Sequence, residues 1–246
     1  MDLAERYRAA VTAAFDPTHD DAGLLPEALA RACVAVLPVE GAGITVTQDL
    51  RVPLGASDEV ALRAERLQTT LGEGPCLEAV LTPLPLTAGL EGLHQRWPAF
   101  AAEFVGQTPY RSVASLPLIP PRGGRRLGAL DLYRTDAEPM DTQLLFQLAT
   151  SVGSPVAAML AGAPVGEDAA GITMPVWLDT ELVHGRMDVW GAVGVVMVAS
   201  SLTNPDALAL LRAYAYGNGT TLDDVAARLT TGALDVDEVV QGVPLG

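Results

Sequence analysis

The sequence predicts two folded units in series: an α/β (or α+β) domain with a central antiparallel sheet, and then an all-α three-helix unit. Strand-length apolar runs alternate with amphipathic helical runs up to about residue 161, whereas only helical patterns follow residue 175. The segment 162–175 between them is rich in Gly and Pro, which predicts a linker. We therefore expect domains at 1–161 and 176–234, with an acidic tail of loose order at 235–246.

The first unit alternates between the two periodicities that distinguish helices from strands. Apolar residues recur every three or four positions in its helical runs and form short continuous runs in its strands. In chain order we expect helices at 2–15 and 24–37, strands at 43–47 and 50–54 around a turn at 48–49, helices at 58–71 and 95–105, strands at 112–119 and 127–133, and a long amphipathic helix at 141–160.

The clearest hairpin signal lies between residues 112 and 133. Two apolar runs of strand length flank a segment of Pro, Gly and Arg at 120–125, a composition typical of a loop. Pro117 lies inside the first run, and because proline cannot donate to a ladder it should sit at a bulge or on an edge.

The second unit shows three helical patterns. Met187, Trp190, Gly194 and Met197 fall on one face of a helix at about 178–199. The next helix starts at Asn204-Pro205 and ends near 217–219, and a third starts at Thr221 with a capping-box spacing to Asp224 and continues to about 229.

The composition limits the kinds of partner. The 246 residues are 49% hydrophobic and carry a net charge of −15, and all 15 basic residues are Arg. So acidic a chain has little general affinity for nucleic acid or anionic membrane. The N-terminus lacks the pattern of a secretory signal, and the apolar stretch 191–199 is far shorter than the roughly 20 residues that span a bilayer. We expect a cytoplasmic protein that does not bind membranes.

No catalytic motif is found in the sequence. The three histidines, His19, His94 and His184, lack the spacing of a metal site or a catalytic dyad, and no phosphate-binding loop or nucleophile elbow is present. We therefore expect a protein that is not an enzyme, with no metal and no cofactor.

The loop at 71–79, LGEGPCLEA, is the most informative local motif. Its two glycines and its proline permit a tight turn that opens a helix. One interpretation is a loop at the edge of a ligand pocket, formed by Gly74, Pro75 and Cys76, in which Cys76 lines the pocket or senses oxidation. The other is a structural turn with a buried thiol. Cys33 is the second cysteine, and a disulfide between the two is not expected.

Five short motifs of the first unit occur in a fixed order: LGEGPC at 71–76, RWPxF at 96–100, RSV at 111–113, PL at 117–118 and LGALDLY at 127–133. Together they resemble the GAF sensor domains of actinobacterial regulators, over about residues 24–161. The resemblance implies an antiparallel sheet covered by helices and a pocket for a small-molecule ligand. GAF domains that bind cyclic nucleotides use a motif with Lys, which this chain lacks, so that ligand is disfavoured.

The second unit resembles ANTAR, the RNA-binding antitermination domain that follows the sensor in those regulators. The resemblance covers roughly residues 178–232 and rests on ten positions: Arg186, Val189, Ala192, Gly194, Met197, Ala207, Leu211, Leu222, Val225 and Ala226. It implies a homodimer formed through the helix that leads into the domain, and binding of paired RNA stem-loops that prevents a terminator from forming. On this resemblance the candidate RNA-binding residues are Arg186, Ala192, Gly194, Arg212, Tyr214, Asn218 and Arg228.

The second unit also departs from that family. Val193 replaces a usual basic residue, Leu208 replaces an aromatic one, and Gly219-Thr220 stands where basic residues are common. Residues 163–246 hold 11 acidic and 3 basic residues, a net charge of −8, whereas phosphate contacts normally supply much of the affinity for nucleic acid.

Two functions therefore stay open. One is a signal-responsive regulator whose sensor domain controls RNA-binding antitermination. The other is a dimeric signalling or protein-interaction module whose output no longer binds RNA. For the second, Arg186 and Arg212 would be ion-pair partners and Asn218 a helix cap. The apolar faces of the helices at 141–160 and 178–199 predict the homodimer.

Overall fold

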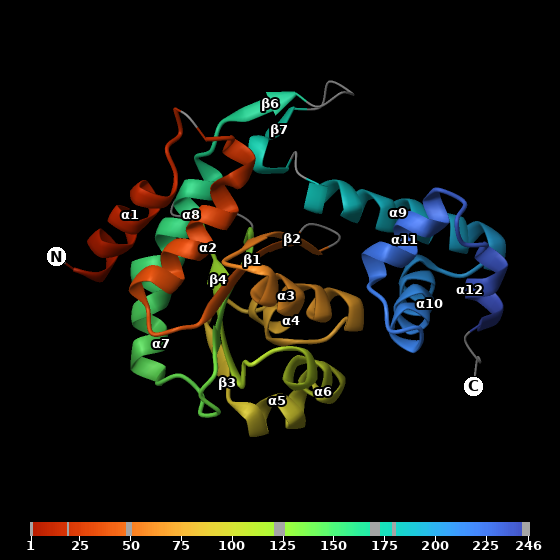
Figure 1. Ribbon diagram of the computed structural model, residues 1–246, viewed down its shortest axis with the longest axis horizontal. Coiled ribbons are helices and arrows are strands. Elements are labelled where there is room, and N and C mark those ends of the chain that lie inside the picture. Colours follow the sequence, from red (N-terminus) through yellow and green to blue (C-terminus); the bar gives the residue numbers. More distant parts are fainter. Residues whose placement is uncertain are drawn as a thin grey trace.

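The computed structural model describes residues 2–18, 20–47, 51–120, 126–167, 173–178 and 181–242. A five-stranded antiparallel sheet in the order β2-β1-β5-β4-β3 forms the centre of the first unit, and a group of helices packs beside it (Figure 1). The fold class predicted from the sequence is confirmed. The strands of the sheet are β1 (Gly41–Thr47), β2 (Arg51–Ala56), β3 (Leu86–Ala88), β4 (Ser112–Leu118) and β5 (Gly128–Arg134).

Helices cover both faces of this sheet. Ile44, Leu130 and Leu132 alternate with polar neighbours along the strands and pack into an aliphatic core with α2 and the α7–α8 helix. The other face packs against α3 and α6, where Phe100, Phe104 and Tyr133 form an aromatic group. The helices of this unit are α1 (Leu3–Ala14), α2 (Leu25–Val36), α3 (Glu59–Leu71), α4 (Pro75–Ala79), α5 (Leu90–Arg96), α6 (Pro98–Gln107), α7 (Thr142–Leu148) and α8 (Ser154–Ala161).

Two prolines bear on the sequence prediction. Pro98 explains a difference between the observed and the expected helices, and Pro117 lies where it was expected. The helix expected at 95–105 corresponds to α6 and the last two residues of α5, most of which was not predicted. The two helices are separate because Pro98 removes a donor and pushes Trp97 out of the helical region. Pro117 pairs with Ala129 on β5, while β3 pairs with β4 only over Val113–Ser115. Pro117 therefore lies past the end of β3, on the edge predicted for it. The expected turn at 48–49 and residues 121–125 of the hairpin loop lie outside the described residues.

The helix expected at 141–160 is α7 and α8 joined by a π-helical turn at Ala149–Gly153. This segment is long and apolar enough to cross a membrane by length and composition. Its buried side chains, among them Leu145, Leu148 and Val156, belong to the core beneath the sheet. That position accounts for its hydropathy.

The second unit contains one helix more than predicted. Its helices are α9 (Glu181–Ser200), α10 (Asn204–Gly217), α11 (Leu222–Thr230) and α12 (Val236–Gly242). The last one lies in the segment expected to be a loosely ordered tail. Val236, Val239 and Val240 form a short apolar stripe that packs on the core of this unit, with Val239 fully buried. The linker holds a small hairpin, β6 (Val165–Glu167) with β7 (Thr173–Pro175).

The apolar stripe predicted on α9 is largely separate from the face that the helix buries. Met187, Trp190 and Gly194 are exposed, and the helix packs through Val189, Val193 and Val196. Helix α9 is apolar around most of its circumference, so periodicity alone could not select the inward face.

Candidate functional site

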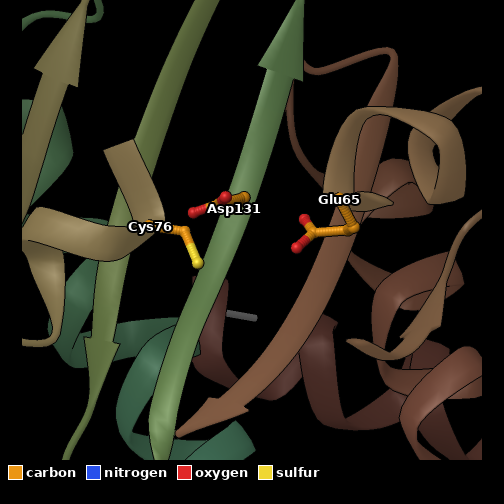
Figure 2. A group of neighbouring side chains, drawn as sticks. All are labelled: Glu65, Cys76 and Asp131. Atoms are coloured by element: carbon orange, nitrogen blue, oxygen red, sulfur yellow. The ribbon is translucent and has the colours of Figure 1, made fainter. Parts of the chain in front are cut away.

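A buried cluster of polar side chains lies between the sheet and helices α3 and α4. Glu65 on α3, Cys76 on α4 and Asp131 on β5 are each 1% exposed. Figure 2 shows the Glu65 carboxylate and the Cys76 thiol directed toward Asp131 from its two sides. We call this set the acid cluster; its other members are Thr45, Arg51, Gln68, Ser115 and Tyr133.

Strand and helix periodicity bring these side chains together. Asp131 and Tyr133 are two residues apart on β5 and so share one face, while Glu65 and Gln68 are three apart on α3 and share another. Gly43 makes room for them: a Cβ atom there would lie 2.1 Å from Glu65 Oε1. The local sequence therefore holds an acidic side chain directly against the strand.

Each oxygen of the Glu65 carboxylate accepts a hydrogen bond from a hydroxyl group. Thr45 Oγ1 donates to Oε2 at 2.6 Å, and Tyr133 OH donates to Oε1 at 2.6 Å. Both donors come from the sheet, from β1 and β5. The sheet therefore stabilises an acidic side chain that a helix brings into the interior.

Asp131 is satisfied in the same way and links the sheet to the loop that precedes α4. Ser115 Oγ donates to Oδ1 at 2.5 Å, and Gln68 Nε2 donates to Oδ2 at 2.6 Å. The carbonyl oxygen of the same Gln68 amide accepts a bond of 2.9 Å from the backbone N–H of Cys76. A change at Asp131 would thus reach this loop through a single side chain.

The environment of the cluster favours the protonated forms of its acids. Burial, reinforced by the nearby Asp131 charge, raises the pKa of Glu65 to about 8, against the smaller opposing effect of its hydroxyl donors. Burial likewise raises the pKa of Asp131 to about 6. The two acids are coupled, so near neutral pH they share protons as a pair.

Arg51 is the basic member of the cluster. Its Nη1 lies 3.6 Å from Cys76 Sγ, and its charge is attracted to Cys76, Asp131 and Glu65, although burial dominates and lowers its pKa. The pKa of the Cys76 thiol is raised well above its ordinary value, first by burial and then by Asp131. A buried thiol of this kind is poorly suited to oxidation sensing, which depends on an accessible thiolate.

One oxygen from each acid and the Cys76 sulfur lie within 4.8 Å of one another, close enough to share a metal ion. The surrounding groups are arranged differently, since each carboxylate oxygen already accepts a bond from a protein donor and a guanidinium faces the sulfur. The arrangement fits a hydrogen-bonded acid pair better than a metal centre.

The predicted ligand residues lie at the edge of this cluster. Gly74 and Pro75 are buried, and Gly74 has a φ of 142°, in a region that glycine favours. A Cβ at Gly74 would come within 2.5 Å of Gln68 Oε1. Their proposed role in ligand binding stays a prediction, and their observed role is to position Cys76 against the acid cluster.

The residues predicted to bind RNA are spread over several surfaces of the helical unit. Arg186 is 2% exposed, and its Nη1 forms an ion pair of 2.8 Å with Asp223. Asn218 donates its side-chain amide to the Tyr214 carbonyl at 2.9 Å, which is the helix-cap alternative. Of the others, Ala192 is buried, Tyr214 and Arg212 are half-buried, and Gly194 and Arg228 are exposed.

Two of these arginines contact the first unit. Arg186 Nε donates to the Arg51 carbonyl at 2.8 Å, and Arg212 Nε donates to the Thr69 carbonyl at 3.3 Å, near the C-terminal end of α3. A cation is favoured there because the last carbonyls of a helix carry partial negative charge. The Leu222 amide of α11 also donates to Thr70 Oγ1 at 3.3 Å. We call these three contacts the docking interface.

Sequence reasoning missed the acid cluster. The sequence contains two signs of this cluster: Asp131 in an otherwise apolar strand and Thr45 in the strand β1. Both are also typical of the ordinary alternation of polar and apolar residues along a strand. Glu65 and Gln68 looked like the solvated face of an amphipathic helix. Only the tertiary arrangement places the four on one buried face.

The comparisons with known proteins concern mainly the first unit. The GAF domain family model matches residues 3–155. The chain is similar to the GAF domain of a phosphoenolpyruvate-protein phosphotransferase from Coxiella burnetii, with 15% identity, 61% of this chain and 90% of that chain covered, and a TM-score of 0.41. It is also similar to a putative GAF sensor protein from Burkholderia vietnamiensis, with 17% identity, 63% and 93% covered, and a TM-score of 0.40. No curated protein matches the chain.

Proposed function

The chain belongs to the GAF domain family, and on that premise we propose that it is a signal-responsive regulator whose GAF domain controls RNA-binding antitermination by the helical unit. The observation that carries the proposal is the docking interface. Arginines that the ANTAR resemblance assigns to RNA are held there by the GAF domain.

Helix α3 connects the acid cluster to this interface. One side of the helix carries Glu65 and Gln68 into the cluster, and its last turn offers Thr69 and Thr70 to the helical unit. A shift of α3 in response to a ligand would therefore change both sets of contacts, because a helix moves largely as a rigid element.

Arg51 makes a second connection. Its side chain faces Cys76 and its carbonyl accepts the Arg186 bond. A ligand or proton that altered the acid cluster would therefore act on Arg51, the residue whose carbonyl also anchors α9. Helix α3 and Arg51 thus provide two physical routes between the signal and the output.

The docked arrangement is the state of low RNA affinity in this proposal. Arg186 is buried and Arg212 is half-buried, which leaves Arg228 as the exposed arginine of the three. Phosphate contacts depend on accessible cations, so an acidic unit with one such residue binds RNA weakly. Release from the GAF domain exposes Arg212 and raises the affinity.

The test is fluorescence anisotropy of a labelled tandem-hairpin RNA with the full chain and with Thr70→Arg. Thr70 belongs to the GAF domain, and an Arg there meets Arg212 and the α11 terminus, so docking is lost while the output surface is unchanged. We expect RNA affinity to rise about tenfold, equivalent to about 1.4 kcal/mol.

The matched control is Thr12→Arg, which adds the same charge on the exposed surface of α1. It should leave the affinity unchanged, and Arg212→Ala with Arg228→Ala should abolish the gain from Thr70→Arg. If no variant binds the RNA even at low salt while circular dichroism reports a folded chain, the antitermination proposal fails.

The second candidate function, a dimeric protein-interaction module, is favoured by the outer face of α9. Met187, Trp190, Val195 and Val198 are 63%, 38%, 40% and 87% exposed, and they recur at helical spacing. The α7–α8 helix, also expected to support a dimer, buries its apolar face in the GAF core.

A homodimer through this α9 face is part of both candidates. Light scattering after size exclusion should give the dimer mass, and Val198→Arg should give the monomer mass. A wild-type monomer at micromolar concentration would contradict it. We further propose that the protein acts in the cytoplasm. We also propose that it acts without catalysis, because each carboxylate oxygen of its two buried acids accepts a hydrogen bond from a protein donor.

A further inference from the structure

A cavity lies between the GAF domain and the helical unit, on the opposite side of α3 from the acid cluster. Its volume is about 320 Å³, at the lower end of the range for small-molecule sites. Residues of α3 and α6 form one wall, and the turn between α10 and α11 forms the other. A compound bound there would contact both domains at once.

Two neighbouring arginines of α3, Arg63 and Arg66, line this cavity. They are three residues apart, so their charges lie on one helix face and repel each other. Arg63 Nη1 donates to the Gln107 carbonyl at 3.3 Å. Among the residues that the structure describes, the Arg66 guanidinium has no hydrogen bond or ion pair of its own. Guanidinium groups that face a cavity can form charge-assisted hydrogen bonds with an anionic group.

The cavity wall also carries three carboxylates, and two of them, Glu103 and Asp224, accept hydrogen bonds from other side chains. Asp224 accepts bonds from Thr220 and Thr221 in the capping box of α11, and these bonds, more than the nearby Arg66, lower its pKa. Glu103 accepts a bond of 2.8 Å from Gln107. Glu59 lies one turn before Arg63 on the same helix face and offsets part of its charge, so Arg66 is the main cation available to a ligand.

The cavity also offers apolar and aromatic surface. Leu67 and Leu71 of α3 line one side, and Tyr216 at the end of α10 lines the other. Tyr216 is 52% exposed, and its ring packs in neither hydrophobic core. An exposed aromatic ring opposite two leucines suits a flat ligand body.

We propose that this cavity binds a small aromatic anion, a carboxylate or a phosphate ester, whose charge meets Arg66 and Arg63 and whose ring packs between Tyr216 and the α3 leucines. Because the ligand contacts both domains, it stabilises the docked arrangement. That regulatory part rests on the proposed function, whereas the binding site itself does not.

The binding site is tested by isothermal titration calorimetry of the full chain without RNA. The probes are phenyl phosphate and benzoate as aromatic anions, inorganic phosphate as an anion without a ring, and benzylamine as a cation of similar shape. We expect phenyl phosphate or benzoate to bind with a Kd below about 1 mM, inorganic phosphate at least about tenfold more weakly, and benzylamine not at all.

Arg66→Gln should weaken the aromatic anion at least about tenfold, and Tyr216→Leu should weaken it about threefold, with the fold unchanged by circular dichroism. Arg31→Gln, which removes an exposed arginine of α2, is the matched control and should bind like wild type. The proposal is overturned if neither aromatic anion gives a heat signal at about 10 mM, or if Arg66→Gln binds as tightly as wild type.

A separate measurement addresses regulation. The bound aromatic anion should lower the affinity of the full chain for the tandem-hairpin RNA and leave Thr70→Arg unaffected, because that variant is already undocked. Binding of the anion with no effect on RNA would keep the site and reject its regulatory role. Absence of RNA binding altogether would reject the proposed function and leave the calorimetric result standing.

Discussion

The GAF domain and the helical unit both bury charged side chains, but they neutralise them differently. The GAF domain holds Glu65 and Asp131 with hydroxyl and amide donors, and their pKa values are raised to about 8 and about 6. In the helical unit, Arg186 is held by the Asp223 carboxylate and also by the Arg51 carbonyl of the GAF domain. The acids therefore change charge near neutral pH, whereas Arg186 is neutralised by an opposite charge. This contrast places the pH-responsive element in the GAF domain and the fixed element in the helical unit.

The largest expected effect comes from breaking the fixed element. Asp223→Ala leaves the Arg186 guanidinium buried without its carboxylate, in a region where Arg51 and Arg212 are also close. Loss of one partner from a buried ion pair typically costs about 3–5 kcal/mol. Urea unfolding should report a decrease near the lower end of this range, because Asp223 is itself 23% exposed.

Asp237→Ala serves as the control for this substitution, because Asp237 is exposed in the first turn of α12. Its effect should stay below about 0.5 kcal/mol. Equal stability of Asp223→Ala and wild type would mean that the Arg186 ion pair contributes nothing to the helical unit.

The responsive element should reveal itself in the pH dependence of stability. Since the pKa of Glu65 is raised from 4.5 to about 8, the folded protein binds more protons than the unfolded chain between these values. The free energy of unfolding therefore falls as the pH rises through this window, by at most about 1.4 kcal/mol per pH unit for one proton. Thermal unfolding across pH 5–8 measures this slope.

Glu65→Gln should flatten the slope, because the amide stays neutral and keeps an oxygen for the hydroxyl donors. Glu91→Gln, at an exposed position of α5, should keep the wild-type slope. A stability that rises with pH in wild type would contradict the raised pKa values of the acid cluster.

A smaller effect is expected from removing one donor of the acid cluster. Tyr133→Phe deletes the hydroxyl that donates to Glu65 at 2.6 Å, and the aromatic packing of the ring is kept. A buried group left without its partner costs about 1–3 kcal/mol. Urea unfolding should show a loss of about 1.5 kcal/mol at pH 8, and less at pH 5, where Glu65 is protonated.

The smallest effect is expected at the docking interface. Arg212 is half-buried and donates a 3.3 Å bond to the Thr69 carbonyl, while burial and the nearby Arg186 and Arg51 lower its pKa to about 10. Arg212→Ala should therefore destabilise the chain by about 0.5–1 kcal/mol in urea unfolding. Arg228→Ala, at an exposed site, should have no measurable effect. A loss above about 2 kcal/mol for Arg212→Ala would mean that docking contributes to the stability of both domains.

The sequence predicted four of the five strands of the GAF sheet and most of its helices because their patterns are local, but it missed the three-residue strand β3 (Leu86–Ala88). Period-two runs and Pro residues sufficed for β4, β5 and the position of Pro117. The inward face of α9 could not be chosen from the sequence because that helix is apolar nearly all round, so only packing against α10 and α11 selects Val189 and Val196. Helix α12 was not predicted because its acidic residues favoured the interpretation of a loosely ordered tail, although three valines recur there at helical spacing.

The acid cluster could not be predicted because its members are far apart in the chain. The Glu65 and Tyr133 pair spans 68 residues, and no local signal distinguishes a buried Glu on a helix from a solvated one. Asn218 was the opposite case, since its helix-cap alternative followed from neighbouring residues alone. A contact between neighbouring residues could thus be predicted from the sequence, whereas a contact between residues far apart in the chain could not.

The central claim is that the GAF domain holds the helical unit through the C-terminal turn of α3. The most direct test is hydrogen exchange at the Leu222 amide, followed by NMR. This amide opens α11 and has no acceptor within its own helix, so its protection comes from Thr70 Oγ1. We predict slow exchange in wild type and in Thr12→Val, and exchange faster by about tenfold or more in Thr70→Val. Fast exchange of this amide in the wild-type chain would contradict the account, because the two domains would then not be docked in solution.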